Sequence, residues 1–555
     1  MKLKNMMICL FFVAYNISEV RDRVIVVAPT EVGVLHTCNC MHDQLLKAVK
    51  DGTAYQVERI VHSGVNPLSK DRSGKTTLHI ASRRNNGVLN VLLRYGAHPN
   101  VGDDDGKSPL WEAVESGLYN NVQVLINYGA NISVRAYGKT LLHLALEKRL
   151  YEIARLLLDR GVVIDAFDDD GDTPLHKAVG LYYDAYRWTT LLVERGASLA
   201  SRDAYGRTPL QRAVSNHTYA YDVIDFLIRC GSSLSVVDKN GATLLHSAAS
   251  CNNVHLTHLF LRSGLDTRRA DKRGKTPLHY AAQNNALDVV KILLQIAWDG
   301  INDSTYKGYT PLTLASYYGY VNMVELLISA GAYINVIDND GNTPLLYAFN
   351  EYNHNQKNAQ LLITKGANVQ MQYSNGDTLL HRAVKRKWYD VIRLLIYRGI
   401  SVNVCNNKGE TPLFGAVHAK DMVSATHLIN YGADVHCVDS RRNTVLHYAA
   451  HNKHIELLHL LIKAGAFVNA QNIVGRTPLH EAFIAKDITG VKILVGYGAY
   501  INLPDDQGNT ILSQVQSLLN NWSWFSSIKS FFGFEMSYKK LKEFESFLLK
   551  NGACI

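Results

Sequence analysis

A short signature recurs fourteen times along this 555-residue chain, at intervals of 32 to 35 residues. Its clearest copies read Thr-Pro-Leu-His and begin at Thr173, Thr276 and Thr477. Most copies continue with an Ala-containing segment, a polar turn, a Leu-rich run and a Gly-Ala exit. A fixed period of this length is the mark of stacked supersecondary units, each of which buries its apolar face only against its neighbours. The chain is therefore expected to form one elongated solenoid rather than several globular domains.

Each part of the signature has a physical task. A Thr before a Pro predicts the start of a helix, because the Thr oxygen can accept from first-turn amides and Pro at the first helical position loses no hydrogen bond. After a polar turn, a Leu-rich run such as Leu457, Leu458 and Leu461 predicts a second helix. Gly465 and Ala466 then predict its end, since Gly favours the left-handed turn.

These residues resemble the ankyrin repeat family, from about residue 42 to residue 555. The resemblance implies an all-α fold, an ankyrin-repeat solenoid of about fifteen helix-turn-helix units with hairpin fingers. It also implies that the signature histidines bond neighbouring backbone and tie successive units together. A row of metal ligands or catalytic bases is the alternative interpretation of the eight signature histidines: His79, His143, His176, His246, His279, His381, His447 and His480.

The repeat pattern divides the chain into five segments. They are a signal peptide over 1–18, a spacer over 19–41, an N-terminal capping repeat over 42–75, the main array over 76–509, and a C-terminal repeat over 510–555. An aromatic insertion, residues 521–536, interrupts the last repeat before a second helix at Tyr538–Lys550. We expect this insertion to cap the stack, whereas a grip on a partner or a membrane surface is the alternative.

Four repeats depart from the regular period. The three intervals of 35 residues, which begin at Thr173, Thr208 and Thr343, are expected to place two extra residues between their helices. In the repeat at Thr276 the sequence Ala297-Trp298-Asp299-Gly300 displaces the usual exit glycine, which suggests a local change of curvature. At a finger tip, Arg442 replaces the expected glycine.

The start of the chain favours export. Lys2 and Lys4 precede an apolar run from Met6 to Tyr15, a pattern that resembles a secretory signal peptide and is too short to span a bilayer. We therefore expect a secreted protein, and a cytoplasmic one with a spurious leader is the alternative. The eight cysteines show no disulfide framework, and loss of the leader leaves an odd number. Export followed by action inside or upon another cell would reconcile these two features.

The composition limits the classes of partner that this chain is expected to bind. A net charge of +9 with no long basic run does not indicate nucleic acid, and no interior apolar stretch predicts a transmembrane segment. No catalytic constellation and no cofactor motif is recognised, so we predict a non-enzymatic protein without a cofactor. The spacer residues His36, Cys38, Cys40 and His42 offer four possible metal ligands, but an incidental spacer is the preferred interpretation.

Partner binding is expected at positions that packing leaves free. Aromatic and basic residues cluster there, and they would suit an acidic partner segment with apolar anchors. The predicted partner-binding residues are Tyr306, Tyr309, Tyr317, Tyr318, Tyr373, Lys385, Arg386, Lys387, Arg441 and Arg442. Tyr is also common in this chain, at 30 residues, so an ordinary solvated surface is the alternative.

The predicted function is a protein-protein interaction module exported as a secreted effector or venom-like factor, and an intracellular scaffold or substrate-recruiting adaptor is the alternative. The identity of the partner and the oligomeric state stay open.

Overall fold

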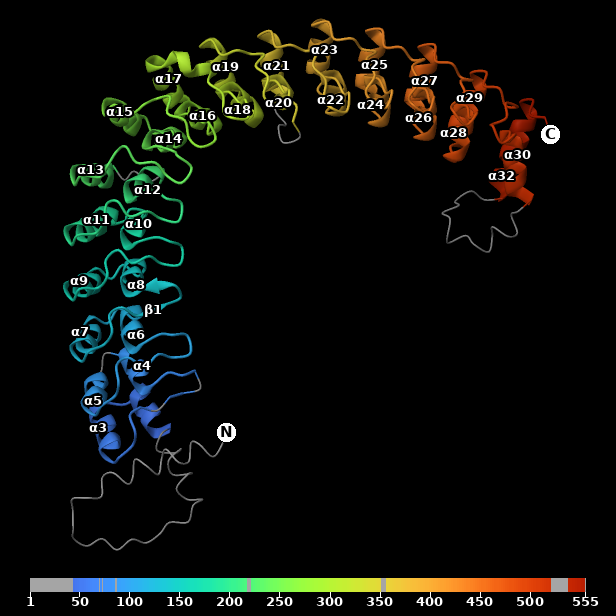
Figure 1. Cartoon of the computed structure of the whole chain (residues 1–555). Coiled ribbons are helices and arrows are strands. Elements are labelled where there is room, and N and C mark those ends of the chain that lie inside the picture. The colour runs from blue at the N-terminus through green and yellow to red at the C-terminus, as the bar shows by residue number, and fades with distance from the viewer. Residues whose placement is uncertain are drawn as a thin grey trace, which may run out of the picture. The chain divides into compact units, whose positions relative to one another are not determined.

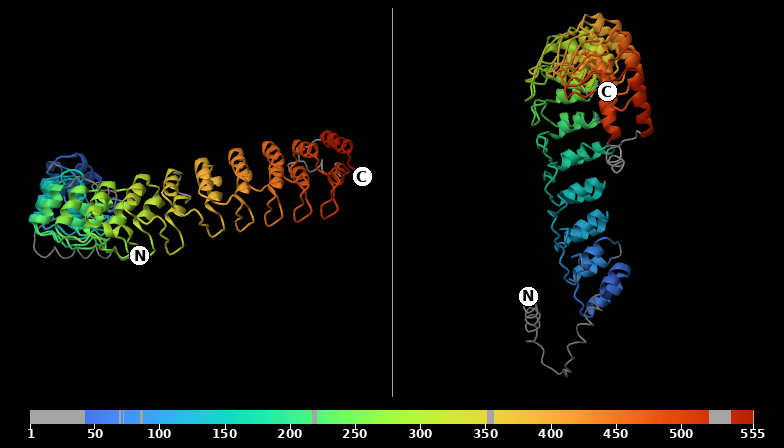
Figure 2. Two further views of the ribbon diagram at one scale, coloured as in Figure 1. Left: turned by 90° about the horizontal axis from the view of Figure 1, so that it is seen from above. Right: turned by 90° about the vertical axis from the view of Figure 1, so that its right-hand side faces the viewer.

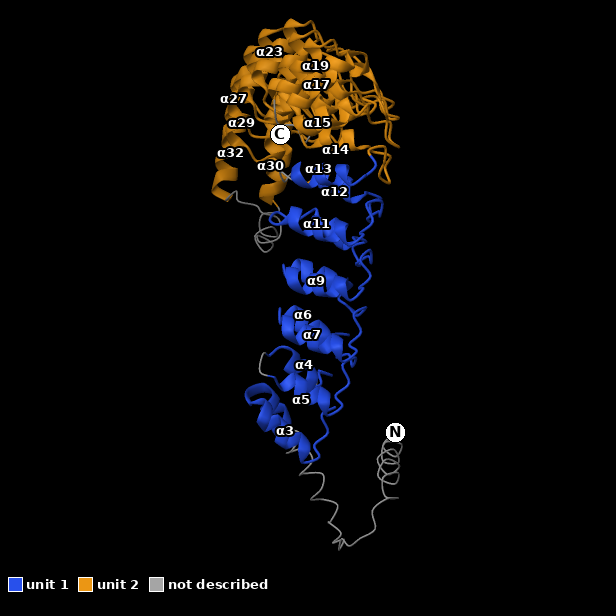
Figure 3. Cartoon of the chain, turned by 90° about the vertical axis from the view of Figure 1, so that its left-hand side faces the viewer, with its two compact units in different colours: residues 1–213, 218–233 blue, residues 214–217, 234–555 orange. Residues whose placement is uncertain are grey.

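The computed structural model describes residues 43–68, 70–71, 73–84, 87–216, 221–350, 356–520 and 538–554. The chain divides into two compact units (Figure 3). Unit 1 comprises residues 1–213 and 218–233, and unit 2 comprises residues 214–217 and 234–555. The predicted signal peptide, most of the spacer and the aromatic insertion at 521–536 lie outside the described residues.

Unit 1 is a row of paired antiparallel helices (Figure 1). Residues 43–51 are helical and precede the first labelled element. The elements that follow are α3 (Ala54–His62), α4 (Thr77–Ser82), α5 (Val88–Arg94), α6 (Pro109–Glu115), α7 (Tyr119–Asn127), β1 (Arg135–Ala136), β2 (Lys139–Thr140), α8 (Leu141–Glu147), α9 (Tyr151–Asp159), α10 (Pro174–Ala178), α11 (Ala185–Glu194), α12 (Pro209–Ser215) and α13 (Tyr221–Arg229). The last residues of α12 belong to unit 2.

Unit 2 repeats the same pairing. Its elements are α14 (Leu244–Ser250), α15 (Val254–Arg262), α16 (Pro277–Gln283), α17 (Leu287–Ile296), the short 3-10 helix η1 (Trp298–Asn302), α18 (Pro311–Tyr318), α19 (Val321–Ser329), α20 (Pro344–Ala348), α21 (Gln356–Thr364), α22 (Leu379–Lys385), α23 (Tyr389–Tyr397), α24 (Pro412–His418), α25 (Met422–Asn430), α26 (Val445–His451), α27 (Ile455–Lys463), α28 (Pro478–Ile484), α29 (Ile488–Gly496), α30 (Ile511–Asn520) and α32 (Tyr538–Lys550). The loops between repeats project to one side of these helix pairs (Figure 2). The all-α solenoid expected from the sequence is confirmed.

The signature histidine closes a reciprocal cap at the start of the first helix. In the repeat at Thr276, the Thr backbone N–H donates to His279 Nδ1 at 3.1 Å, and the Thr hydroxyl lies 2.8 Å from the same nitrogen. His279 therefore takes the place of the Glu or Gln that usually completes a capping box. Because Nδ1 is an acceptor here, the neutral ring carries its proton on Nε2.

The Nε2–H group of His279 forms a hydrogen bond with the next repeat. His279 Nε2 donates to the backbone carbonyl of Tyr309 at 3.0 Å, at the base of the following finger. The same bond, at 2.9 to 3.4 Å, joins His79 to Lys107, His143 to Asp172, His176 to Arg207, His246 to Lys275, His381 to Glu410, His447 to Arg476 and His480 to Asn509. The predicted structural role of these histidines is confirmed, since each links its own helix to the next repeat.

Small residues let the first helices approach closely. Ala281 and Ala282 on α16, like Ala449 and Ala450 on α26, are fully buried. The second helices supply larger core side chains such as Leu457. Packing of this kind removes apolar area from water at every interface, which is how a solenoid gains stability without a single central core.

The fingers are tight polar turns. In unit 1 one finger is a regular hairpin, in which β1 pairs antiparallel with β2 and Arg135 lies opposite Thr140. Elsewhere an aspartate holds the turn, as where Asp271 Oδ1 accepts from the backbone N–H groups of Arg273 and Lys275, both at 2.8 Å. Arg442 adopts the left-handed conformation, with φ of +58°, that the glycine usually supplies at this position.

The irregular repeats absorb their extra residues where the sequence predicted. The 35-residue intervals lengthen the loops between α10 and α11, α12 and α13, and α20 and α21. In the repeat at Thr276 the displaced glycine falls in η1, which follows α17 directly and replaces the usual exit turn. Arg268 pairs there with Asp299 at 2.9 Å and with Asp303 at 2.7 Å.

Both end repeats have the helices that the sequence predicted. In the first, Leu45, Val49 and Val57 are buried. In the last, α32 follows the predicted bounds Tyr538–Lys550, and Phe544 stacks on Phe483 with ring centroids 6.0 Å apart. The final helix therefore contacts α28 of the preceding repeat.

Candidate functional site

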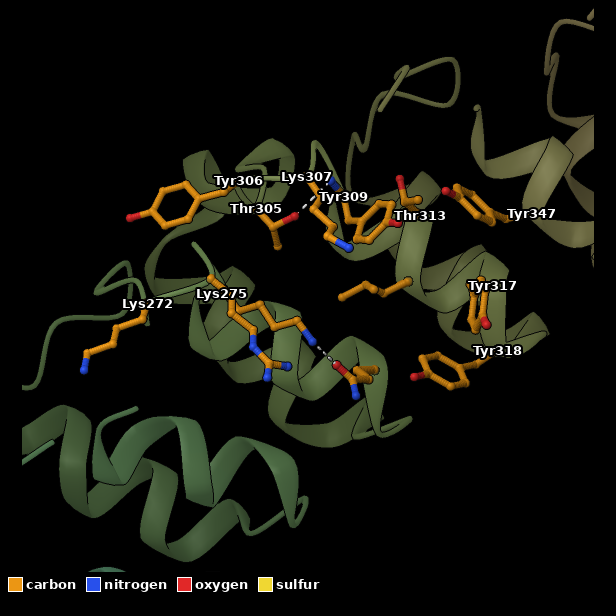
Figure 4. Close-up of a pocket in the computed structure, with 13 residues that line it drawn as sticks. Lys272, Lys275, Thr305, Tyr306, Lys307, Tyr309, Thr313, Tyr317, Tyr318 and Tyr347 are labelled. Atoms are coloured by element: carbon orange, nitrogen blue, oxygen red, sulfur yellow. Dashed lines mark hydrogen bonds between the residues drawn. The ribbon is translucent and has the colours of Figure 1, made fainter. Parts of the chain in front are cut away.

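Unit 2 contains a cavity of about 570 Å³ that is lined mainly by tyrosines and cationic side chains (Figure 4). We call it the tyrosine cavity. Its lining residues are Lys272, Arg273, Lys275, Gln283, Thr305, Tyr306, Lys307, Tyr309, Thr313, Leu314, Tyr317, Tyr318 and Tyr347. They come from the first helices α16, α18 and α20 and from the two fingers at 271–275 and 305–309. Three successive repeats therefore share the cavity.

Close packing of the two fingers fixes one edge of the cavity. The backbone N–H of Tyr306 donates to the carbonyl of Arg273 at 3.1 Å. Gly274 makes this approach possible, because its φ is +80° and a Cβ there would lie 2.8 Å from the Tyr306 nitrogen. The basic finger residues and Tyr306 are thus carried on one hydrogen-bonded edge.

Aromatic rings form the opposite side. Tyr317 makes edge-to-face contacts with Tyr318 at 5.1 Å and with Tyr347 at 5.7 Å, and Tyr309 packs on Tyr347 at 5.9 Å between ring centroids. The Tyr347 hydroxyl donates to the Asp338 carboxylate, which holds that ring in place. Tyr318 remains 45% exposed. These interlocked rings form a preformed apolar wall that carries polar hydroxyl groups.

The cationic side is unusual in its lack of carboxylates. No Asp or Glu lines the cavity among the described residues. Lys275 Nζ donates to the neutral amide oxygen of Gln283 at 2.5 Å. The nearby Asp271 is already engaged, since its second carboxylate oxygen accepts from the Tyr280 hydroxyl at 3.0 Å.

Burial changes the acid-base behaviour of these groups. Burial lowers the pKa of Lys275, and the Asp271 carboxylate opposes this only in part. Burial also raises the pKa of Tyr318, and burial together with the bond to Asp338 raises that of Tyr347. Tyr318 and Tyr347 therefore stay neutral hydroxyl groups at physiological pH.

Of the predicted partner-binding residues, the structure brings Tyr306, Tyr309, Tyr317 and Tyr318 to the tyrosine cavity. Tyr373 does not line it. The Tyr373 hydroxyl donates instead to the backbone carbonyl of Leu346 at 3.0 Å, and its ring lies under the Arg382 guanidinium, 4.4 Å from the ring centroid. Burial raises the pKa of this phenol.

The predicted basic residues also lie outside the cavity lining. Arg386 Nη2 donates to the backbone carbonyls of Phe349 and Asn350, at 3.2 and 2.6 Å, so it satisfies the C-terminal end of α20. The remaining residues of this predicted group are exposed: Lys385, Lys387, Arg441 and Arg442.

The sequence prediction missed the cations that do line the cavity, namely Lys272, Arg273, Lys275 and Lys307, together with Tyr347. The signal was present in the fingers before Thr276 and Thr310, where these basic residues flank Gly274 and Gly308. Reading neighbouring fingers together, rather than one repeat at a time, would have found it.

Metal and catalytic interpretations gain no support within the described part of the chain. No group of three or more His, Cys, Asp or Glu side chains is placed there to hold a metal ion. His451 lies 3.0 Å from Glu481, and His459 lies 3.1 Å from the Tyr497 hydroxyl, so each of these two histidines has its own side-chain neighbour. The four possible metal ligands at 36–42, for which the sequence favoured an incidental spacer, lie outside the described residues.

Comparisons with known proteins agree with the repeat. A family model described as ankyrin repeats (3 copies) matches residues 45–136, 86–168, 133–203, 210–302, 296–373, 351–425 and 416–505. None of the described helices combines the length and hydrophobicity that a bilayer-spanning segment requires.

Similar proteins differ widely in the roles their names give. The chain is 30% identical to Potassium channel AKT2/3 of Arabidopsis thaliana over 136 residues, which cover 24% of this chain and 17% of the channel. It is 31% identical to E3 ubiquitin-protein ligase KEG of Arabidopsis thaliana over 182 residues, 30% of this chain and 11% of the ligase. It is 32% identical to Putative ankyrin repeat protein FPV244 of Fowlpox virus over 123 residues, 22% of this chain and 18% of that protein. The similarity therefore spans less than a fifth of each relative.

Proposed function

Because the chain belongs to the ankyrin repeat family, we propose that it is a non-enzymatic protein-binding array whose main partner docks in the tyrosine cavity. Repeats of this kind are protein-protein interaction modules that present extended binding surfaces. One observation carries the assignment of the site. The tyrosine cavity combines preformed aromatic rings, hydroxyl groups and cations, with no carboxylate among its described lining residues.

Tyrosine suits such a surface for physical reasons. Its ring offers a large contact area with few rotatable bonds, and its hydroxyl group offers a polar contact. In the tyrosine cavity the rings already contact one another, so little conformational entropy is lost when a partner binds. The fingers and first helices thus supply a rigid, partly wet surface of the kind that interface anchors occupy.

The affinity test uses two tyrosines on α18. Replacing Tyr317 and Tyr318 together with Ala should weaken binding of the main partner, recovered by affinity purification with the full chain, by roughly 30-fold or more, since aromatic anchors typically contribute about 2 kcal/mol or more. The matched control is Tyr397→Ala, because Tyr397 is 86% exposed on α23 and lies outside the cavity lining. Unchanged affinity in the double variant, with the helical melt intact, would refute the assignment.

We also propose that the protein is exported and acts as a secreted effector or venom-like factor. Lys2, Lys4 and the apolar run that follows support this proposal. The five described cysteines, Cys230, Cys251, Cys405, Cys437 and Cys554, are free thiols, which suits a final site of action that is reducing. An intracellular scaffold or substrate-recruiting adaptor is the second candidate, favoured by the same free thiols.

A secretion assay separates these two candidates. The full chain should reach the medium of a eukaryotic host with its leader removed, and a chain that lacks residues 1–18 should stay inside the cell. Recovery of the purified extracellular protein with Met1–Ser18 still attached, or equal retention of both forms, would favour the intracellular candidate.

A further inference from the structure

Lysines at the end of two unit 1 fingers are neutralised within their own repeat. Lys107 Nζ lies 3.1 Å from Glu115 Oε2, and Lys139 Nζ lies 2.5 Å from Glu147 Oε2. In both repeats the lysine stands directly before the first residue of the signature, and the carboxylate stands eight residues after the lysine on the first helix. In these two repeats a cation at this position is therefore neutralised by a carboxylate eight residues further on.

In unit 2 the residue eight positions after Lys275 carries a neutral amide instead of a carboxylate. Gln283 stands eight residues after Lys275, and its Oε1 accepts from the Lys275 ammonium at 2.5 Å. The amide keeps the shape and the hydrogen bond of the Lys–Glu pair but supplies no negative charge. Lys275 is only partly exposed, so its charge is costly without a counter-ion.

Neighbouring cations strengthen this positive charge. Lys272 and Arg273 on the same finger and Lys307 on the next finger line the cavity as well. In Figure 4 Lys272 lies at one end of the cavity and Tyr317, Tyr318 and Tyr347 lie at the other, with Lys307 beside Tyr309 between them. The site thus has a cationic side and an aromatic side within one volume of about 570 Å³.

We propose that the tyrosine cavity receives an acidic peptide segment of the partner, with a carboxylate against Lys275 and its neighbouring cations and an apolar side chain against the tyrosines. This inference rests on the proposed function and adds the chemistry of the occupant. Charge complementarity selects a carboxylate, because the cavity supplies cations and no acidic group. The adjacent aromatic wall selects an apolar residue close to that carboxylate in the peptide.

The test begins with a random peptide library displayed on phage and selected on the full chain. We expect the selected peptides to be enriched in Asp or Glu close to an aromatic or branched apolar residue. Their affinity should fall about tenfold in Gln283→Glu, because the new carboxylate would neutralise Lys275 as Glu147 neutralises Lys139. Versions of the same peptides with Gln in place of Glu should bind wild type and Gln283→Glu equally.

A second variant removes charge without adding any. Lys272→Gln with Lys307→Gln should also weaken the acidic peptides about tenfold, and the loss should shrink at high salt. The matched control is Lys365→Gln with Lys463→Gln, which removes the same charge from exposed ends of α21 and α27 and should leave affinity unchanged.

The outcomes separate this inference from the proposed function. Selected peptides that lack acidic residues but still require Tyr317 and Tyr318 would overturn the inference and leave the docking site standing. Peptides that bind independently of both tyrosines, or a selection that yields none, would overturn both. Tighter binding of phosphatidylserine vesicles or a single-stranded oligonucleotide through Lys272 and Lys307 would also overturn the acidic-peptide assignment.

Discussion

The finger surface of unit 1 and the tyrosine cavity of unit 2 use the same scaffold positions with opposite results for charge. In unit 1, the Lys107 ammonium, directly before the signature residue Ser108, lies 3.1 Å from the Glu115 carboxylate. In unit 2, the side-chain acceptor that the described part of the chain offers to Lys275 is the neutral amide of Gln283. Both regions are rich in charged residues, so the number of charges does not distinguish them. What distinguishes them is whether the scaffold neutralises its own cations.

The acid-base behaviour of the two lysines expresses this difference. Burial alone would lower the pKa of Lys107, but the Glu115 carboxylate raises it above the ordinary lysine value. Burial lowers the pKa of Lys275, and Asp271 compensates only in part. The proposed binding site therefore differs from the unit 1 fingers in that its lysine lacks a paired carboxylate, while the packing of the repeat is the same.

The largest expected effect is the loss of stability on acidification, and it tests whether both units share one scaffold. Burial lowers the pKa of all eight signature histidines, for His279 to about 4. The unfolded chain takes up protons as the pH falls through about 6.5, but the folded chain does not until its lower pKa is reached. Stability is thus greatest above pH 6.5 and decreases toward pH 4, by about 3 kcal/mol for His279 alone.

Denaturant midpoints measured by circular dichroism between pH 7 and pH 4 check this prediction. Both units should lose hydrogen-exchange protection over the same pH range, because histidines of this kind occur in each. Paired carboxylates such as Asp439, whose pKa lies below the ordinary value, contribute their loss only at still lower pH. A midpoint that stays constant down to pH 4 would contradict the buried neutral tautomer.

A smaller effect is expected from removing one histidine in each unit. His143→Ala leaves the Thr140 hydroxyl and the Asp172 carbonyl without their partner. His279→Ala leaves the Thr276 N–H and the Tyr309 carbonyl without theirs. Each substitution should cost about 2–3 kcal/mol. His480→Ala should cost less, because its bond to the Asn509 carbonyl is longer, at 3.4 Å. Urea denaturation measures all three. A large loss in only one unit would mean that the two scaffolds differ in more than surface charge.

Much of the scaffold was predictable from the sequence because its determinants are local. Thr followed by Pro marked the starts of α10, α16 and α28, and the apolar spacing marked α32 before any contact was known. The histidine bonds to neighbouring backbone were expected from the resemblance to the ankyrin repeat family. Local capping and periodicity are therefore enough to define the array.

The site was only partly predictable because it depends on contacts between repeats. Arg386 was expected on the binding surface, but it donates to the carbonyls of Phe349 and Asn350, which lie 37 and 36 residues earlier. The Tyr373 hydroxyl likewise donates to the backbone carbonyl of Leu346, 27 residues earlier. Whether a charged or aromatic residue is available for a partner is decided by such neighbours, and spacing within one repeat does not reveal them.

The smallest expected effect comes from exchanging the two kinds of acceptor and measuring stability alone. Glu115→Gln should destabilise the chain by about 0.5–1 kcal/mol, because the partly buried Lys107 would lose its counter-ion. Gln283→Glu should stabilise it by a similar amount, since Lys275 would gain one. Both changes should shrink in 1 M salt, where the screening length is about 3 Å. If Gln283→Glu instead destabilises the chain at low salt, another group already compensates Lys275, and the contrast between the two units would not hold.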